Sequence, residues 1–337
     1  MSNILDIIIP IYNTPEEYLV RALNSINKQR NLDFKSVNVI VVDDASKKIK
    51  YKKSWFKQRF PKLHVTNLFN EENVGPGVTR QHGIDAGDGK YITFLDSDDE
   101  FVGFESIKNI IECLIQFNLD KLSTSVNEEV VDERDVINIK HDSNSLQSLH
   151  ALYLKRDFLT KNNIKFDDKL RRYEDLYYLT IVNAMAGESQ AFVDEITYNW
   201  KWNQQSMMRN SMQKYPDLEA QIYALTKSLE FLDKKVCSFD KNYVSNLLII
   251  CSIINSNILD LPEYFHLKKE YLSLFDILFE NNKNKFDNVG YEFVRKNINL
   301  IIQSLNRMYP WVVLNDSFKD FINRLEKTYG NKQESSD

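Results

Sequence analysis

Four short apolar runs, each typical of a buried strand, divide the first hundred residues of the chain. They span residues 5–9, 37–42, 63–68 and 91–95. The segments between them have helical spacing. The first of these opens with Thr14-Pro15, a capping residue followed by a proline at the first helical position, and then places Leu19, Ala22, Leu23 and Ile26 on one face. Strands that alternate with helices predict βαβ units and a parallel sheet, in which ligands bind beyond the carboxyl ends of the strands.

The pattern becomes looser after residue 100. We expect a helix near residues 106–117, an irregular polar stretch at 128–144, a helix near 173–186 and short strands around 191–200. These elements are expected to complete the same domain, which would end at residue 212.

A second module is predicted for residues 213–330, where apolar residues recur at three-to-four spacing. The clearest example is the series Leu218, Ile222, Leu225, Leu229 and Leu232. The tail, residues 331–337, is expected to be disordered. The predicted fold class is therefore α/β, with a mostly parallel sheet and an all-helical C-terminal module.

Composition narrows the possible functions. The 337 residues leave room for about two domains, and the net charge of −5 gives no bulk basicity for binding nucleic acid or anionic membranes. The 20 Phe and 17 Tyr exclude a disordered chain. Three cysteines form neither a disulfide framework nor a zinc site. With no signal peptide and no apolar run long enough to span a membrane, we expect a soluble cytoplasmic protein.

Side chains suited to a nucleotide follow the first two predicted strands. Tyr12 and Asp44 should lie side by side at the carboxyl edge of the sheet, where a ring stacks on a base and a carboxylate accepts from its N–H groups. The simpler alternative is that Asp44 belongs to a helix cap with turn-forming residues.

Three further motifs suit an anionic substrate. Asn73-Val74-Gly75-Pro76-Gly77 opens a helix that carries Arg80, and such a helix start attracts anions. Asp96-Ser97-Asp98-Asp99 ends a strand with three carboxylates, which favour Mg²⁺ or Mn²⁺ unless this is only a solvated loop. Glu174-Asp175 begins a helix, where acidic residues also serve simply as caps.

In this order and spacing, the five motifs resemble those of family 2 inverting glycosyltransferases with the GT-A fold, over about residues 4–210. The resemblance implies a nucleotide-binding half at residues 1–100 and an acceptor half at 101–212. It implies that Asp98 binds a divalent cation, Mn²⁺ or Mg²⁺, with Asp96 toward the ribose and the metal, and that Asp175 is the catalytic base. The implied donor-binding positions are Pro10, Tyr12, Asp44, Asn73, Gly77, Arg80, Asp96 and Ser97.

The chain departs from the family in one place. Some relatives have a histidine just after an aromatic segment like Tyr198–Trp202, and this chain has none there, so Lys201 or Gln205 substitutes for it or the metal keeps a water. His150 lies near the acceptor site or is structural. Trp202, with Trp200, forms a platform for a sugar or packs in the core. Glu174 is a further candidate beside Asp175.

The resemblance predicts a metal-dependent transfer of sugar from a nucleotide donor, expected to be a UDP-sugar, to a hydroxyl group. The acceptor expected first is a cell-wall or surface polysaccharide or a teichoic-acid-like polymer, and a hydroxymethylated DNA base is a less favoured choice. An aspartate-nucleophile phosphohydrolase and a non-catalytic binding protein remain alternatives. Acceptor binding, homo-oligomer formation and docking of a partner stay open for the helical module, as does association with a membrane surface.

Overall fold

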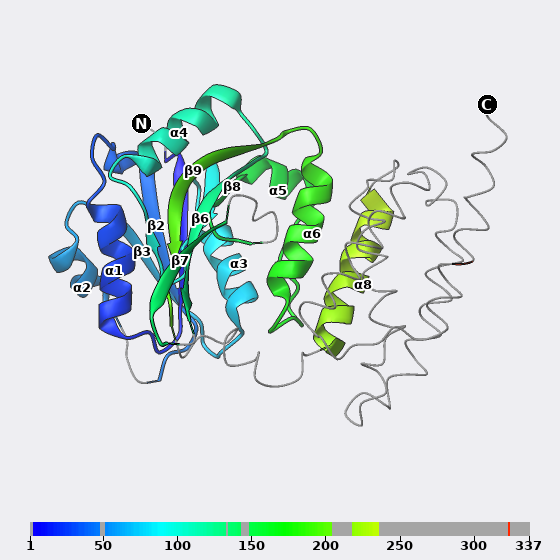
Figure 1. Cartoon of the computed structure of the whole chain (residues 1–337), viewed down its shortest axis with the longest axis horizontal. Coiled ribbons are helices and arrows are strands. Elements are labelled where there is room, and N and C mark those ends of the chain that lie inside the picture. The colour runs from blue at the N-terminus through cyan, green and yellow to red at the C-terminus, as the bar shows by residue number, and fades with distance from the viewer. Residues whose placement is uncertain are drawn as a thin grey trace. The chain divides into compact units, whose positions relative to one another are not determined.

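The computed structural model describes residues 3–47, 51–132, 134–142, 148–203, 218–235 and 323 of the chain. Within this part, nine strands form one mixed sheet in the order β3-β2-β1-β4-β8-β6-β9-β5, with β7 paired to β6 (Figure 1). The strands are β1 Leu5–Ile11, β2 Val37–Asp43, β3 His64–Phe69, β4 Tyr91–Phe94, β5 Glu100–Phe101, β6 Lys121–Val131, β7 Ile137–Asp142, β8 Leu152–Lys155 and β9 Gln190–Trp200.

The first four strands run parallel, as the alternation of strands and helices predicted. β8 is antiparallel to both β4 and β6, so that β6 and its parallel neighbour β9 continue in the direction of β1. The second half of the domain therefore extends the first half's sheet and does not form a sheet of its own. The predicted α/β class is confirmed for the described residues, but the sheet is mixed and not mostly parallel, because β5, β7 and β8 pair antiparallel with their neighbours.

Helices cover both faces of the sheet. The short 3-10 helix η1 precedes β2, and α3 and α6 lie side by side against one face (Figure 1). The remaining helices of this domain connect the strands. The bounds are α1 Glu16–Asn27, η1 Phe34–Ser36, α2 Lys53–Arg59, α3 Pro76–Ala86, α4 Ser106–Phe117, α5 Arg156–Asn162 and α6 Glu174–Ala186.

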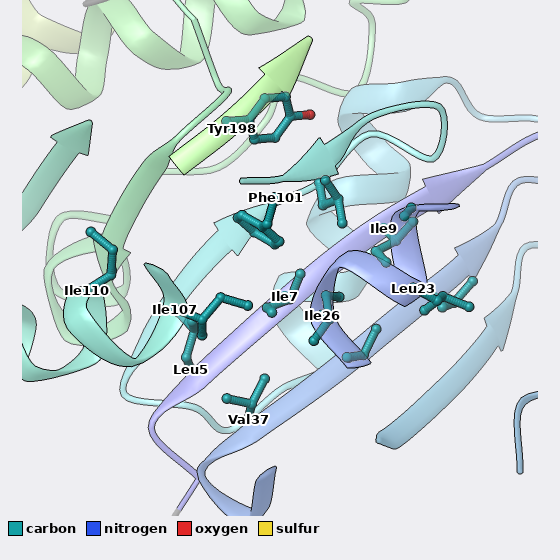
Figure 2. Packing of buried hydrophobic residues seen from close by; sticks show 14 of the residues in the cluster. Leu5, Ile7, Ile9, Leu23, Ile26, Val37, Phe101, Ile107, Ile110 and Tyr198 are labelled. Atoms are coloured by element: carbon teal, nitrogen blue, oxygen red, sulfur yellow. The ribbon is translucent and has the colours of Figure 1, made fainter. Parts of the chain in front are cut away.

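The main apolar core lies between the sheet, α1 and α4. Alternate residues of β1, Leu5, Ile7 and Ile9, point toward it, since side chains along a strand face opposite sides in turn (Figure 2). The predicted apolar face of α1 meets them and is fully buried. Phe101 and Tyr198 close the core from the second half of the sheet (Figure 2). One core thus holds both halves of the sheet in a fixed relation.

Three local predictions were wrong. The strand predicted at 63–68 is present as β3, but it is a partly exposed edge strand, because only β2 pairs with it. The stretch predicted as irregular contains the end of β6 and all of β7, which pair antiparallel with each other. Thr14 does not cap α1: Pro15 holds that position, and the Thr14 hydroxyl bonds to Ser97 instead.

The chain divides into two compact units, Met1–Gln221 and Ile222–Asp337. The apolar series that starts at Leu218 was predicted to be helical, and it lies on helix α8, Leu218–Lys235. Leu225, Leu229 and Leu232 of this helix are buried. The predicted boundary at residue 212, most of the helical module and the tail lie outside the described residues. Among the described helices, none has the length and apolar character needed to cross a membrane.

Candidate active site

The carboxyl ends of β1, β2 and β4 lie next to one another and bring the predicted motifs together. Ile11 at the end of β1 is in register with Asp43 at the end of β2, and Ile8 of β1 is in register with Phe94, the last residue of β4. Tyr12, Asp44 and Asp96 follow these strand ends. A hydrogen bond of 2.9 Å between the hydroxyl groups of Thr14 and Ser97 joins the first motif to the acidic one.

Asp44 holds the glycine loop. One carboxylate oxygen accepts from the backbone N–H of Val74 at 2.9 Å and from the side chain of Asn70 at 2.9 Å, and the other accepts from the N–H of Gly75 at 3.0 Å. Only 4% of Asp44 is exposed. Tyr12, in contrast, is 49% exposed at the same edge, where its ring is open to a planar ligand.

The glycine loop leads into α3 and needs its glycines for two different reasons. Gly75 has a φ of +89°, a conformation that costs other residues energy. Gly77 faces α6, and a Cβ there would lie 2.9 Å from the Cβ of Glu174. Arg171, which sequence reasoning missed, donates to the side-chain and backbone oxygens of Asn73 at 2.9 Å each. The loop is therefore joined to the segment that precedes α6.

Arg80 lies in the interior, one turn into α3, with 8% of its side chain exposed. It donates to Asp96 at 2.8 Å and to Glu174 at 3.0 Å. Burial alone would lower the pKa of the guanidinium, but the two carboxylates raise it. Burial has the opposite effect on the Glu174 carboxyl: it raises the pKa to about 7, although the charge of Arg80 lowers it. Arg80 thus connects the acidic motif with the first residue of α6.

Asp96, Asp99 and His150 form the one group, within the described part of the chain, whose ligand atoms are placed to hold a metal ion. Those atoms lie within 4.8 Å of one another. His150 Nε2 is 3.3 Å from Asp96 and 3.8 Å from Asp99, and its ring stacks on that of Tyr198 with centroids 4.8 Å apart. Sequence reasoning could not place His150 here, because this lone histidine belongs to no motif.

The electrostatics of this group favour a cation. Burial raises the pKa of Asp99 to about 8, helped by the charges of Asp98 and Asp96 and opposed by His150. Burial opposes the charge of Asp96 as well, but Arg80 and His150 hold the pKa of that carboxyl well below its usual range. Asp99 also accepts from the Tyr198 hydroxyl at 2.7 Å. A carboxylate that is costly to ionise beside two others is stabilised when a positive ion shares the site.

Asp98, the metal ligand implied by the resemblance, lies outside that group. One of its carboxylate oxygens accepts from the side-chain amide of Asn203 at 2.7 Å, and its backbone carbonyl accepts from Arg21 of α1. Asn203 was not singled out from the sequence, and it directly follows the aromatic segment Tyr198–Trp202. The role of Asp98 as a metal ligand stays a prediction.

Asp175 lies in the first turn of α6, beside the buried Glu174, and is itself partly exposed. One of its carboxylate oxygens accepts from the backbone N–H of Leu176 at 2.8 Å. The helix start is thus placed against the glycine loop by Glu174, while Asp175 keeps access to solvent.

The remaining candidates have structural contacts. The Lys201 ammonium pairs with Glu129, and its backbone N–H donates to Asp99 at 2.8 Å. The backbone N–H of Trp202 donates to Glu129 at 2.9 Å, and Trp200 packs against the apolar core. Pro10 is a partly buried residue within β1. Gln205 lies outside the described residues.

Comparisons with known proteins match the chain to glycosyltransferases. Residues 6–115 match the model of glycosyl transferase family 2. An uncharacterized glycosyltransferase, YibD of Escherichia coli, is 23% identical over 272 residues, which are 74% of each chain. The minor teichoic acid biosynthesis protein GgaB of Bacillus subtilis is 27% identical over 58% of this chain, but over only 22% of its own length. Two further bacterial glycosyltransferases match over 31% and 34% of their lengths.

The fold also matches solved structures of S. aureus TarS. The crystal structure of TarS residues 1–349 in complex with UDP has a TM-score of 0.56 and 18% identity, and the match covers 79% of this chain and 74% of that one. The complex with UDP-GlcNAc gives a TM-score of 0.57 and 20% identity, over 74% and 71% of the chains. These likenesses establish the architecture of the sheet and its helices. The matched family model and the glycosyltransferases among the relatives show that residues 6–115 carry a domain of glycosyl transferase family 2.

Proposed function

We propose that this chain transfers a sugar from a UDP-sugar to a hydroxyl group of a polymer, with inversion at the anomeric carbon. One observation carries the proposal. The acidic motif at 96–99, the glycine loop that opens α3 and the α6 start that bears Asp175 meet at one edge of the sheet, joined by Arg80. Nucleotide-binding α/β proteins place their ligands at this edge. Such an arrangement suits a ligand with a base, a diphosphate and a reacting sugar.

The donor would lie across the ends of β1, β2 and β4. The exposed ring of Tyr12 would stack on the base, and the start of α3 would face the diphosphate with its free N–H groups. Because Asp44 is already bonded to the glycine loop, we propose that it shapes the base site by holding that loop and offers any further contact through the same carboxylate.

The residues present fit a divalent cation, because carboxylate oxygens and an imidazole nitrogen gather within reach of one another. Asp96, Asp99 and His150 would hold Mn²⁺ or Mg²⁺. We propose Asp98 as a further ligand on the strength of the motif resemblance alone. When bound, the cation would neutralise negative charge on the leaving diphosphate.

Asp175 would act as the base. It would take the proton of the acceptor hydroxyl while the hydroxyl oxygen forms a bond to the anomeric carbon of the sugar. The bond from that carbon to the diphosphate oxygen breaks, and its electron pair leaves with UDP. Attack from the side opposite to the leaving group inverts the configuration. The partial exposure of Asp175 leaves room for the acceptor.

The acceptor is proposed from the relatives. TarS was solved with UDP-GlcNAc, and GgaB is named for minor teichoic acid biosynthesis. We therefore propose UDP-GlcNAc as the first donor to test and a teichoic-acid-like polymer as the first acceptor.

The test is UDP release from a panel of nucleotide sugars with Mn²⁺, before and after addition of candidate polymers. We expect one UDP-sugar to be consumed, faster with its acceptor, and Asp98→Asn to lose the Mn²⁺-dependent rate. Asp194→Asn, which changes a carboxylate that is 66% exposed on β9, should keep the wild-type rate. The proposal is contradicted if no nucleotide sugar releases UDP, or if Asp98→Asn releases it as fast as the wild type.

A further inference from the structure

Two motifs that are far apart in the sequence share one buried guanidinium. Arg80 donates through one terminal nitrogen to Asp96 and through the other to Glu174, 16 and 94 residues away. The group is planar, and its two nitrogens point in fixed directions. A pair of bonds from such a group therefore fixes both the separation and the orientation of the two carboxylates.

The start of α6 depends on this contact. Tyr173, the residue before the helix, has a φ of +59°. A non-glycine residue in this conformation costs energy, which neighbouring contacts have to offset. Glu174, the first residue of the helix, supplies such a contact by its bond to Arg80.

The glycine loop holds the same segment at two other points. Gly77 leaves room for the side chain of Glu174, which would otherwise meet a Cβ at 2.9 Å. Arg171 bonds twice to Asn73 at the beginning of the loop. The segment 171–174 is thus fixed to the loop and to α3, and Arg80 connects it to the acidic motif.

From these contacts we infer that Arg80 is a positioning residue, which sets the α6 start and therefore Asp175 at a fixed distance from the acidic motif. It acts through Glu174 and Asp96 and does not bind the donor itself. This inference rests on the proposed function insofar as Asp175 is the base. An error of about 1 Å in the place of a reacting group can lower a rate by about 100-fold.

The test uses the full chain with Arg80→Lys, Glu174→Met and Glu174→Gln. Lysine offers one point charge, which cannot bridge both carboxylates in the fixed geometry of a guanidinium. Methionine keeps the volume of Glu174 without an acceptor, and glutamine restores an acceptor. Glu188→Met, at an exposed position just beyond the other end of α6, is the matched control.

For catalysis, we expect Arg80→Lys and Glu174→Met each to lower kcat for transfer at least 10-fold, while the Kd for UDP changes less than 3-fold. Glu174→Gln should recover much of the rate, and the double variant Arg80→Lys/Glu174→Met should be no slower than the slower single variant. The inference is overturned if Arg80→Lys weakens UDP binding 10-fold or more with kcat unchanged, or if the two effects multiply.

Hydrogen exchange tests the inference separately from the proposed function. The backbone N–H of Tyr177 bonds to the Tyr173 carbonyl in the first turn of α6. We expect that amide to exchange at least 10-fold faster in Arg80→Lys and Glu174→Met, and amides of α5 to be unaffected. Unchanged exchange at the α6 start overturns the positioning role even if the wild type transfers no sugar, whereas loss of protection supports it in that case too.

Discussion

Replacing Asp44 by asparagine tests how much the hydrogen bonds that its carboxylate accepts contribute to stability and to the proposed donor site. Its two carboxylate oxygens accept three hydrogen bonds from the loop that follows β3. Asparagine has the same shape but only one accepting oxygen. Whichever way the amide turns, its NH₂ group faces at least one N–H donor. The variant therefore loses at least one hydrogen bond and sets two donors against each other in a buried place.

The magnitude follows from these contacts. A hydrogen bond to a charged group contributes about 1.5–3 kcal/mol, and the bonds that remain weaken to about 1 kcal/mol because their acceptor becomes neutral. We expect Asp44→Asn to lower the free energy of unfolding by about 3 kcal/mol. The neighbouring Asp43 is the matched control: one of its oxygens accepts from the N–H of Ser46, and the other is buried with no partner among the described residues.

Urea unfolding of both variants at pH 7.5 measures the difference. Asp43→Asn can place its NH₂ group where no donor opposes it, so its free energy of unfolding should stay within about 1 kcal/mol of the wild type. The UDP affinity of Asp44→Asn should also fall, because the loop proposed to face the diphosphate is no longer held by three hydrogen bonds. Equal losses of stability in the two variants would refute the role assigned to Asp44.

Three other substitutions test the contacts around the site. Gly77→Ala places a Cβ 2.9 Å from Glu174, and this overpacking, about 1–3 kcal/mol, should outweigh the gain of about 1 kcal/mol from alanine in a helix; a stabilised variant in urea unfolding would contradict the close contact. Burial raises the pKa of Glu174 to about 7, so the free energy of unfolding of the wild type should fall by up to about 3 kcal/mol as the pH rises from about 4.5 to 7. Glu174→Gln should lose this pH dependence. The same pH dependence in the variant would contradict the assignment to Glu174. Arg156→Met breaks an ion pair of 2.5 Å with the fully buried Asp6 and should lower the free energy of unfolding by about 3–5 kcal/mol. The UDP affinity of the folded variant should not change, because Asp6 lies at the start of β1, at the opposite end of the strand from the proposed donor site. Weaker UDP binding would contradict this prediction.

The sequence predicted the first half of the sheet because its signals are local. The runs at 5–9, 37–42 and 91–95 are apolar except for Asp6, Asn38 and Thr93, and the apolar face of α1 has a regular spacing. The strand β7 could not be predicted in this way. It lies at an edge, exposes Ile137 and Ile139, and is held by backbone bonds to β6 that no side-chain pattern records.

The candidate site was predictable where residues follow strands and unpredictable where partners come from distant loops. Parallel strands deliver Tyr12, Asp44 and Asp96 to one edge, so their order along the chain was enough. The approach of His150 to Asp96 depends on the antiparallel β8, and the burial of Arg80 depends on the packing of α3 against α6. Both are properties of the three-dimensional arrangement, which no local motif contains.

The proposed role of Asp175 as the catalytic base is tested most directly by measuring the transfer of sugar from the UDP-sugar to the acceptor in Asp175→Asn. With the donor and acceptor found in the nucleotide-sugar screen, the variant should bind UDP with the wild-type Kd. Its transfer rate should fall by about 100-fold or more, since general base catalysis contributes about 10²–10⁴-fold. A variant that binds UDP normally and still transfers sugar at nearly the wild-type rate would contradict the account.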